Sequence, residues 1–338
     1  MISYGSRTRH LGGVMKAVVY EQYGGPDVLR FSEVATPVPG AGEVLIRIHA
    51  TTVTSADWRV RSLDVPRGFG LLSRLALGIT RPRQPILGTD LSGIVTSVGG
   101  AVTKFKPGDA VFAFPGVRMG CHAEYRSLSQ DAAIALKPAN LSHAEAAPLV
   151  FGGTTALHFL RAARLGPGSR VLVNGASGAV GTAAIQLAKH FGAEVTAVCS
   201  GGNAGLVTSL GADHVIDYTK EDFTRNGRLY DVIMDTAGTA PFARSRGSLR
   251  DGGQLLVVLG GLRDLLSIPW IALTDSRKVI GGTATASAED LRLLATLAER
   301  EELKPVIDRS YRFDDVVEAH RYVDTGRKKG SVVITLEH

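Results

Sequence analysis

The second half of the chain alternates short apolar runs with amphipathic stretches. The runs predicted as strands are Val171–Val173, Glu194–Cys199, Val215–Asp217, Asp231–Asp235, Gln254–Leu259 and Lys278–Gly281. After the first of them, apolar residues from Val180 to Phe191 recur with the spacing of one helix face packed on a sheet. A second helix is predicted over Asn203–Leu210. Strands that alternate with helices predict an α/β fold with a doubly wound parallel sheet.

The first half has a different pattern, in which short β-type segments between Met15 and about Pro138 are interrupted by glycine and proline. The clearest of these segments are Lys16–Tyr20, Glu43–Thr51, Gly93–Val98 and Ala110–Phe114. Their spacing predicts a small barrel-like β domain. Near the end of the chain, Ala288–Arg300 and Asp314–Asp324 predict helices, and Ser331–Thr335 predicts a final strand.

The strand Val171–Val173 leads into a glycine turn and then a helix, which is the arrangement of a phosphate site. Free backbone N–H groups and the helix dipole at such a turn both attract an anion. Gly178 would let the backbone approach a pyrophosphate, and Gly181 would let the helix pack close to the strand. Ala176 stands where the first glycine of G-x-G-x-x-G is expected, so an ordinary turn without a ligand is the alternative. The predicted cofactor contacts in this turn are Ser177, Gly178, Ala179, Val180 and Gly181.

Composition excludes several classes of protein. At 338 residues the chain can hold two domains, and 44% hydrophobic with 21% charged residues is typical of a soluble globular protein. The sequence contains no run of apolar residues long enough to predict a membrane span. The formal net charge of +6 comes without a basic stripe interleaved with aromatic residues, so we expect no nucleic-acid partner.

The two cysteines and the N-terminal segment bear on location. Cys121 and Cys199 stand far apart, which supports neither a disulfide framework nor a multi-cysteine metal site and favours a reducing, cytoplasmic compartment. Residues 1–14 are mostly polar and basic and lack the apolar core of a signal peptide. We predict that they form a disordered N-terminal extension before the fold begins at Met15.

Five segments of the chain carry a family resemblance. They are Pro85–Gly93, Val102–Asp109, Ala123–Tyr125, Asn174–Gly181 and Ser209–Tyr218. Together they resemble the medium-chain dehydrogenase/reductase superfamily, and within it the zinc-independent quinone oxidoreductases of the ζ-crystallin and chloroplast-envelope type. The resemblance implies a GroES-like catalytic domain over residues 15–150 and 284–338, interrupted by a Rossmann dinucleotide-binding domain over residues 151–283. The cofactor would lie in the cleft between the two domains.

The zinc alcohol dehydrogenases of this superfamily hold their metal with Cys, His and Cys, and the matching positions here are Thr54, Thr89 and Phe151. A hydroxyl and a benzyl group cannot replace thiolate and imidazole as zinc ligands, and Cys121-His122 has no partners at ligand spacing. We therefore predict no metal site. Without zinc to polarise an alcohol oxygen, alcohol oxidation loses its main electrophile. Reduction of an activated C=C bond or a quinone does not need one.

The choice of nicotinamide depends on the loop that follows the second strand. NAD enzymes usually carry Asp or Glu there for the ribose hydroxyls, whereas this loop has no carboxylate and offers Ser200 and Asn203 as donors to a 2′-phosphate. The resemblance implies that Tyr218 contacts the same phosphate. These residues favour NADPH. The alternatives are a turn and a helix N-cap for Ser200 and Asn203, and a surface aromatic for Tyr218.

Further cofactor contacts are expected at the carboxyl ends of the parallel strands, which supply Gly238, Leu259 and Gly260. The resemblance implies that Thr155 lies near the nicotinamide, and a helix-cap hydroxyl is the alternative. Families of this kind often carry Lys where this chain has Ser331. A cofactor contact from the C-terminal segment is therefore left open.

The substrate pocket is expected to contain Thr54, Trp58 and Phe151. Trp58 could stack on a flat quinone, and a core aromatic is the alternative. Asp57 is predicted to hold the loop, and the proton for the reaction could come from water or from Thr54.

These observations predict an NADPH-dependent reductase of quinones or α,β-unsaturated carbonyls, which transfers a hydride without zinc. The alternatives are a zinc-independent alcohol or aldehyde dehydrogenase and a non-catalytic NADPH-binding scaffold protein. We expect a small-molecule quinone or enone as substrate, neither a nucleic-acid partner nor a membrane span, and a homodimer.

Overall fold

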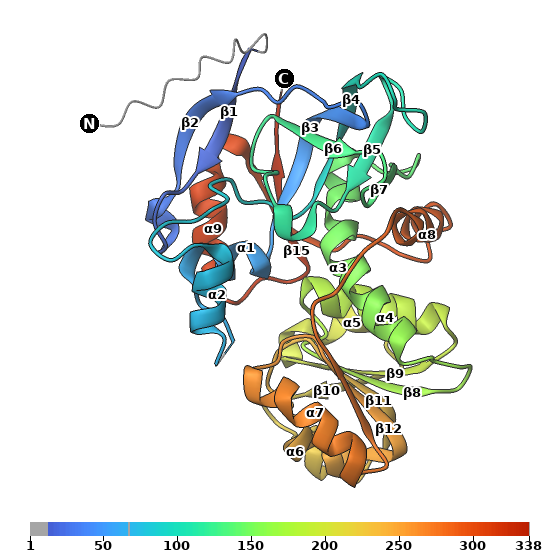
Figure 1. Ribbon diagram of the computed structural model, residues 1–338. Coiled ribbons are helices and arrows are strands. Elements are labelled where there is room, and N and C mark those ends of the chain that lie inside the picture. Colours follow the sequence, from blue (N-terminus) through green and yellow to red (C-terminus); the bar gives the residue numbers. More distant parts are fainter. Residues whose placement is uncertain (1–12, 67, 338) are drawn as a thin grey trace.

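The computed structural model describes residues 13–66 and 68–337, and the long helix α3 (His143–Ala162) lies between an upper and a lower domain (Figure 1). Of the predicted extension over residues 1–14, residues 1–12 lie outside the described residues. Val14 is already the first residue of β1 (Val14–Val19), so the fold begins one residue earlier than the predicted Met15 and the first strand two residues earlier than the predicted Lys16.

The lower domain is built on a six-stranded parallel sheet in the order β10-β9-β8-β11-β12-β13. Its strands are β8 (Arg170–Asn174), β9 (Glu194–Cys199), β10 (His214–Asp217), β11 (Tyr230–Asp235), β12 (Leu249–Val257) and β13 (Lys278–Gly281). Its helices are α4 (Ala179–His190), α5 (Ala204–Ser209), α6 (Phe242–Ser245) and α7 (Leu262–Thr274). Successive residues of β8 are buried in separate clusters on the two faces, because helices cover both. The predicted doubly wound parallel sheet is confirmed.

The upper domain has a seven-stranded sheet, in the order β14-β15-β3-β4-β5-β7 with β6 beside β3. Its strands are β3 (Glu43–Val53), β4 (Leu91–Val98), β5 (Ala110–Ala113), β6 (Tyr125–Ser129), β7 (Ile134–Leu136), β14 (Ile307–Arg312) and β15 (Ser331–Thr335). β1 pairs separately with β2 (Arg30–Ala35). The other helices are α1 (Ser55–Ser62), α2 (Gly70–Leu77), α8 (Ala288–Glu299) and α9 (Val316–Asp324). Because β15 pairs with β3, the end of the chain completes this domain (Figure 1).

Helix α3 packs on both domains, and the predicted boundary between residues 150 and 151 falls inside it. It contacts β3 and β15 of the upper sheet and α4 of the lower domain. A Cβ on Gly152 would collide with the Ala179 carbonyl oxygen, so this glycine lets α3 approach the start of α4. The helix was not predicted, because it is buried on several sides and therefore lacks an amphipathic repeat.

The strand order reverses beside β8. The chain passes from β8 through β9 to β10, and then crosses back to β11 on the other side of β8. Open α/β sheets bind ligands at the carboxyl ends of the strands at such a switch point. Asn174 ends β8 and Asp235 ends β11, and Asn174 Nδ2 donates to Asp235 Oδ1 over 2.9 Å. The fold therefore places the expected site at these two residues.

Two further features match the composition. Both cysteines, Cys121 and Cys199, are buried free thiols. Within residues 13–66 and 68–337, no helix combines the length and apolar character needed to cross a membrane.

Candidate active site

Three glycines shape the turn between β8 and α4. Gly175 has a φ of +81°, the left-handed conformation that glycine adopts without strain, so the turn begins here and not at the buried Ala176. A Cβ on Gly181 would collide with the Gly175 carbonyl oxygen, which explains the close packing of α4 on the turn. A Cβ on Gly178 would meet only that oxygen, at 3.6 Å. The space beside Gly178 is therefore open, as a pyrophosphate site requires.

The N-terminus of α4 adds the electrostatic part of this site. Gly178 is the N-cap residue, and no side chain among the described residues forms a cap hydrogen bond there. The first turn of α4, which holds Ala179 and Val180, thus has N–H groups available for an anion. The segment before β15 closes the turn from the upper domain, because Gly330 N donates to the Ser177 carbonyl oxygen over 2.8 Å.

Ser177, Ser200 and Asn203 come together at the ends of β8 and β9. Asn203 Nδ2 lies 3.0 Å from Ser177 Oγ and 3.2 Å from Ser200 Oγ. Asn203 occupies the N-cap position of α5, as the alternative expects, but its side chain forms no cap hydrogen bond. The result is a cluster of polar groups beside the glycine turn, at the place where the sequence predicts the 2′-phosphate.

Tyr218 and Asp217 approach the same loop from β10. Tyr218 N donates to the Cys199 carbonyl oxygen over 3.1 Å, and the Tyr218 side chain is 64% exposed, which leaves it free to contact a ligand. Asp217 was not predicted as a site residue. Hydrogen bonds from Thr219 lower the pKa of Asp217, and the amide of Gly201 also donates to its carboxylate. One carboxylate therefore borders the loop, although it comes from β10 and not from β9.

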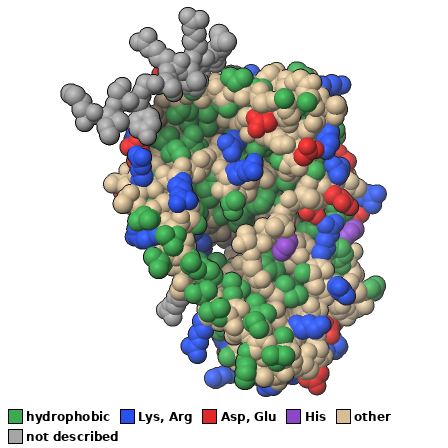
Figure 2. Space-filling view, viewed as in Figure 1, with side chains coloured by type: hydrophobic (Ala, Val, Ile, Leu, Met, Phe, Trp, Pro, Cys, Tyr) green, Lys and Arg blue, Asp and Glu red, His purple; other side chains and the backbone are tan. Residues whose placement is uncertain are grey.

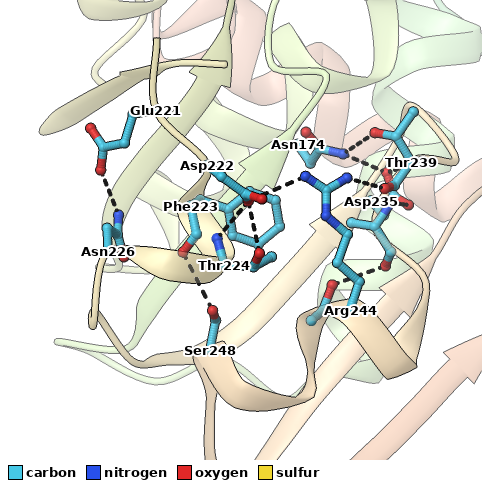
Figure 3. Close-up of polar contacts among 12 residues, drawn as sticks. Asn174, Glu221, Asp222, Phe223, Thr224, Asn226, Asp235, Thr239, Arg244 and Ser248 are labelled. Atoms are coloured by element: carbon cyan, nitrogen blue, oxygen red, sulfur yellow. Dashed lines mark hydrogen bonds and ion pairs between the residues drawn. The ribbon is translucent and has the colours of Figure 1, made fainter. Parts of the chain in front are cut away.

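Figure 3 shows how the loop after β11 is fixed. The buried Asp235 carboxylate accepts the N–H groups of four successive residues, at distances of 2.7 to 3.4 Å. These residues are Ala237, Gly238, Thr239 and Ala240. Arg244 Nη1 donates to the Thr239 carbonyl oxygen, and its Nη2 lies 3.2 Å from Asp222. Asp235 thus holds Gly238, a predicted cofactor contact, at the edge of the crevice.

A cavity of about 490 Å³ opens between the two domains. Figure 2 shows hydrophobic side chains gathered along the hollow between the upper and lower parts of the molecule. Phe151, Thr155, Val180 and Leu259 line the cavity together with Thr89 of the upper domain. Thr155 lies inside α3, so the alternative of a helix-cap hydroxyl is wrong. This space suits a flat apolar molecule placed next to a ligand of the glycine turn.

A second cavity of about 540 Å³ continues along the strand ends. It shares Arg59 and Leu259 with the first and is also lined by Asp235, Gly238 and Gly261. Gly260 lies between two of these residues, after β12, where a Cβ would come within 2.6 Å of Val257. The predicted residues Gly238 and Leu259 thus line these adjoining cavities, and Gly260 lies in the same loop as Leu259.

Thr54 and Trp58 do not line the cavity. Thr54 caps α1 and lies behind Thr89, with 3.3 Å between the two hydroxyl oxygens. Trp58 packs against the apolar core of the upper domain, and the Arg59 guanidinium lies 4.9 Å from its ring centre. Asp57 accepts the Thr54 hydroxyl at 2.6 Å and the Gly88 N–H at 2.8 Å, which confirms that it holds this loop.

Comparison with known proteins agrees with this architecture. Residues 40–139 match the family model of the alcohol dehydrogenase GroES-like domain, and residues 210–334 match that of zinc-binding dehydrogenases. The 2-methylene-furan-3-one reductase of Solanum lycopersicum is 37% identical over 332 residues, which cover 95% of this chain and 79% of that protein. The chain belongs to the medium-chain dehydrogenase/reductase superfamily.

Two further relatives refine the placement within the superfamily. The chloroplastic quinone-oxidoreductase QR1 of Triphysaria versicolor is 33% identical, over 96% of this chain and 99% of that protein. The solved quinone oxidoreductase of Coxiella burnetii superposes with a TM-score of 0.85 at 30% identity, over 96% of this chain and all of that one. This medium-chain dehydrogenase/reductase is therefore an oxidoreductase of the quinone oxidoreductase-like group, and a nicotinamide cofactor belongs to its chemistry.

The three zinc-ligand positions of the superfamily converge in this member, but their side chains do not fit a zinc ion. Thr54 and Thr89 lie side by side, and Phe151 lines the same cavity as Thr89. Two neutral hydroxyls and a phenyl ring provide no thiolate, imidazole or carboxylate. The hydroxyl proton of Thr54 is also directed to Asp57. Together, these three side chains offer no ligand set for zinc.

Asp90, next to Thr89, gives a testable pH effect. Burial raises its pKa to about 8, and it accepts hydrogen bonds from Thr52 N and Thr52 Oγ1. Above the ordinary pKa of aspartate and below pH 8, the folded chain holds a proton that the unfolded chain has lost. The free energy of unfolding therefore falls as pH rises, by up to about 1.4 kcal/mol per pH unit from this group. We expect Asp90→Asn, whose amide oxygen can still accept Thr52 N and whose NH₂ group can donate to Thr52 Oγ1, to flatten that slope in urea unfolding between pH 5 and 8. An unchanged slope contradicts the assignment.

Proposed function

We propose that this protein is an NADPH-dependent reductase of quinones or α,β-unsaturated carbonyls, and that hydride transfer needs no zinc. One observation carries the proposal. An apolar cavity joins the phosphate turn, and the superfamily's metal-ligand positions beside that cavity hold Thr54, Thr89 and Phe151. A site of this kind suits an acceptor that is already activated for hydride attack. The names of the relatives, a quinone oxidoreductase and an enone reductase, support the same substrate class.

The residues of the crevice would act mainly by binding and orienting. Gly178 and the α4 N-terminus would hold the pyrophosphate, and Phe151, Val180 and Leu259 would exclude water from the reacting faces. The bound nicotinamide supplies the hydride. Holding the acceptor carbon against that ring accounts for most of the rate enhancement that such a site can provide.

A panel assay tests this proposal and separates it from its alternatives. Purified protein is assayed with NADPH and a benzoquinone, and with NADPH and an enone. A third assay contains NADP⁺ and a primary alcohol. The proposal requires turnover with the quinone or the enone. Turnover only with the alcohol would support a zinc-independent dehydrogenase, and NADPH binding without any turnover would support a scaffold protein.

Preference for NADPH over NADH rests on Ser200 and Asn203 beside the turn. We expect Ser200→Asp to weaken NADPH binding about 10- to 100-fold through repulsion of the 2′-phosphate, and to change NADH binding little. Fluorescence titration of both cofactors gives the dissociation constants. Ser200→Asn, neutral and polar, is the matched control. Equal losses for both cofactors, or a wild-type preference for NADH, would show that this loop does not contact the 2′-phosphate.

The location and assembly belong to the same proposal. Buried free thiols at Cys121 and Cys199 suit a reducing cytoplasm. A homodimer is supported by β13, which ends its sheet, and by α7 beside it, where Leu266, Trp270 and Leu273 are 69 to 83% exposed. Sedimentation at several protein concentrations distinguishes a dimer from a monomer.

A further inference from the structure

The hydroxyl groups behind the substrate cavity form an ordered chain. Thr54 Oγ1 donates to Asp57 Oδ2 over 2.6 Å, and Asp57 also accepts the Thr54 and Gly88 N–H groups, both at 2.8 Å. Asp57 is fully buried, and Thr54 is the N-cap residue of α1 in a capping box with it. Both residues are thus fixed by several bonds. The hydroxyl proton of Thr54 is used inside the protein and does not point to the cavity.

Thr89 differs from its neighbours in two ways. It is one of the residues that line the 490 Å³ cavity, although it is only 3% exposed, so its side chain borders the space proposed for the acceptor. Its hydrogen-bond partner is Thr54 Oγ1 at 3.3 Å, which is long for a bond between hydroxyl groups. Because the proton of Thr54 goes to Asp57, the proton in this long contact belongs to Thr89. A weakly held hydroxyl proton can turn to a better acceptor at little cost.

We propose that Thr89 is a catalytic residue, whose hydroxyl proton turns from Thr54 Oγ1 to the carbonyl oxygen of the acceptor, and that Thr54, held by Asp57, positions the Thr89 hydroxyl until the acceptor binds. The proposal rests on the function proposed above. When the hydride bonds to the β-carbon of an enone, the C=C electron pair moves and the negative charge gathers on the carbonyl oxygen. A hydrogen bond to that oxygen becomes charge-assisted and therefore stronger in the transition state. Water then protonates the α-carbon and completes the reduction.

Thr89→Val tests the proposal because it removes the hydroxyl with almost no change of shape. We expect kcat for an enone to fall about 10- to 100-fold, while KM and the dissociation constant of NADPH stay close to wild type. Thr89→Ser, which keeps the hydroxyl, should restore most of kcat. The melting temperature checks that both variants fold. A change in kcat/KM of less than about twofold in the folded Val variant would overturn the proposal.

The role of Thr54 as a positioning residue is tested by combining changes. We expect Thr54→Ala to lower kcat in the wild-type background and to have little further effect in the Thr89→Val background, because both act through one hydroxyl. If the two losses simply multiply, Thr54 acts independently of Thr89 and the positioning role is wrong. Loss of the α1 cap is expected to lower the melting temperature equally in both backgrounds, so stability cannot produce this difference.

A binding measurement separates this proposal from the proposed function. The probe is 4-nitrophenolate, a flat phenolate whose absorbance changes when its oxygen accepts a hydrogen bond. We expect it to bind the NADP⁺ complex of the wild type and to lose about tenfold in affinity in Thr89→Val. If the loss appears but no quinone or enone is reduced, the proposed function fails and the hydrogen bond stands. If acceptors are reduced but probe affinity is equal in both proteins, the role of Thr89 is wrong.

Discussion

Gly178→Val is expected to fold normally and to lose NADPH binding by about 100-fold or more. The backbone at Gly178 has φ −80° and ψ 172°, which any residue adopts, and a Cβ there would meet only the Gly175 carbonyl oxygen at 3.6 Å. The fold therefore tolerates the side chain, at a cost of about 1 kcal/mol or less. The branched side chain would occupy the volume proposed for the pyrophosphate. NADPH titration by fluorescence, together with thermal melting, measures both effects.

Gly181 provides the matched control, because it lies in the same turn and faces the protein. A Cβ at Gly181 would collide with the Gly175 carbonyl oxygen and also lie within 3 Å of Ala176. We expect Gly181→Val to lower the melting temperature strongly, whereas Gly178→Val does not. Near-normal NADPH affinity in folded Gly178→Val would mean that the pyrophosphate lies elsewhere, and the proposed cofactor contacts around it would be wrong.

Asp235→Ala is expected to cost about 3 kcal/mol or more of folding stability and most of the cofactor affinity. The carboxylate accepts the amide N–H groups of residues 237–240 and Asn174 Nδ2, and its removal leaves these donors without their acceptor. The loop that carries Gly238 would then no longer be held at the edge of the crevice. Urea unfolding gives the change in stability, and NADPH titration gives the change in affinity.

Asp235→Asn separates the two effects of this residue. Its amide oxygen can still accept the N–H groups that bond to Oδ1, but the acceptor for Ala240 N is lost. We expect a smaller loss of stability than with alanine and an intermediate NADPH affinity. If the alanine variant binds NADPH as tightly as wild type at a temperature where it is folded, the loop after β11 plays no part in cofactor binding.

The sequence predicted the fold class and the position of the phosphate turn, because both depend on local patterns. The strand from Val171 and the helix that follows are adjacent in the chain, and their apolar period and glycines are read directly. The backbone conformation inside the turn is not evident from the motif. The spacing places Ala176 at the position of the first glycine, and the structure shows the left-handed conformation one residue earlier, at Gly175.

What could not be predicted depends on contacts between distant segments. Arg61 is fully buried and bonds to His320 Nδ1 at 2.8 Å, and no local pattern indicates a buried arginine. In the sequence, Asp235 looks like any other carboxylate at the end of a strand. Only the structure shows that the following loop folds around it. Trp58 was expected to line the pocket, but α1 turns Arg59 and Val60 toward the cavity. Such placements depend on the packing of whole domains.

The central claim is hydride transfer from NADPH to a quinone or enone without zinc, and the most direct measurement is turnover by metal-depleted protein. The protein is dialysed against a chelator, its metal content is determined by mass spectrometry, and NADPH oxidation is followed with a benzoquinone and an enone. We predict turnover equal to that of untreated protein and no gain on adding zinc. Loss of turnover on chelation, restored by about one zinc per chain, would contradict the account.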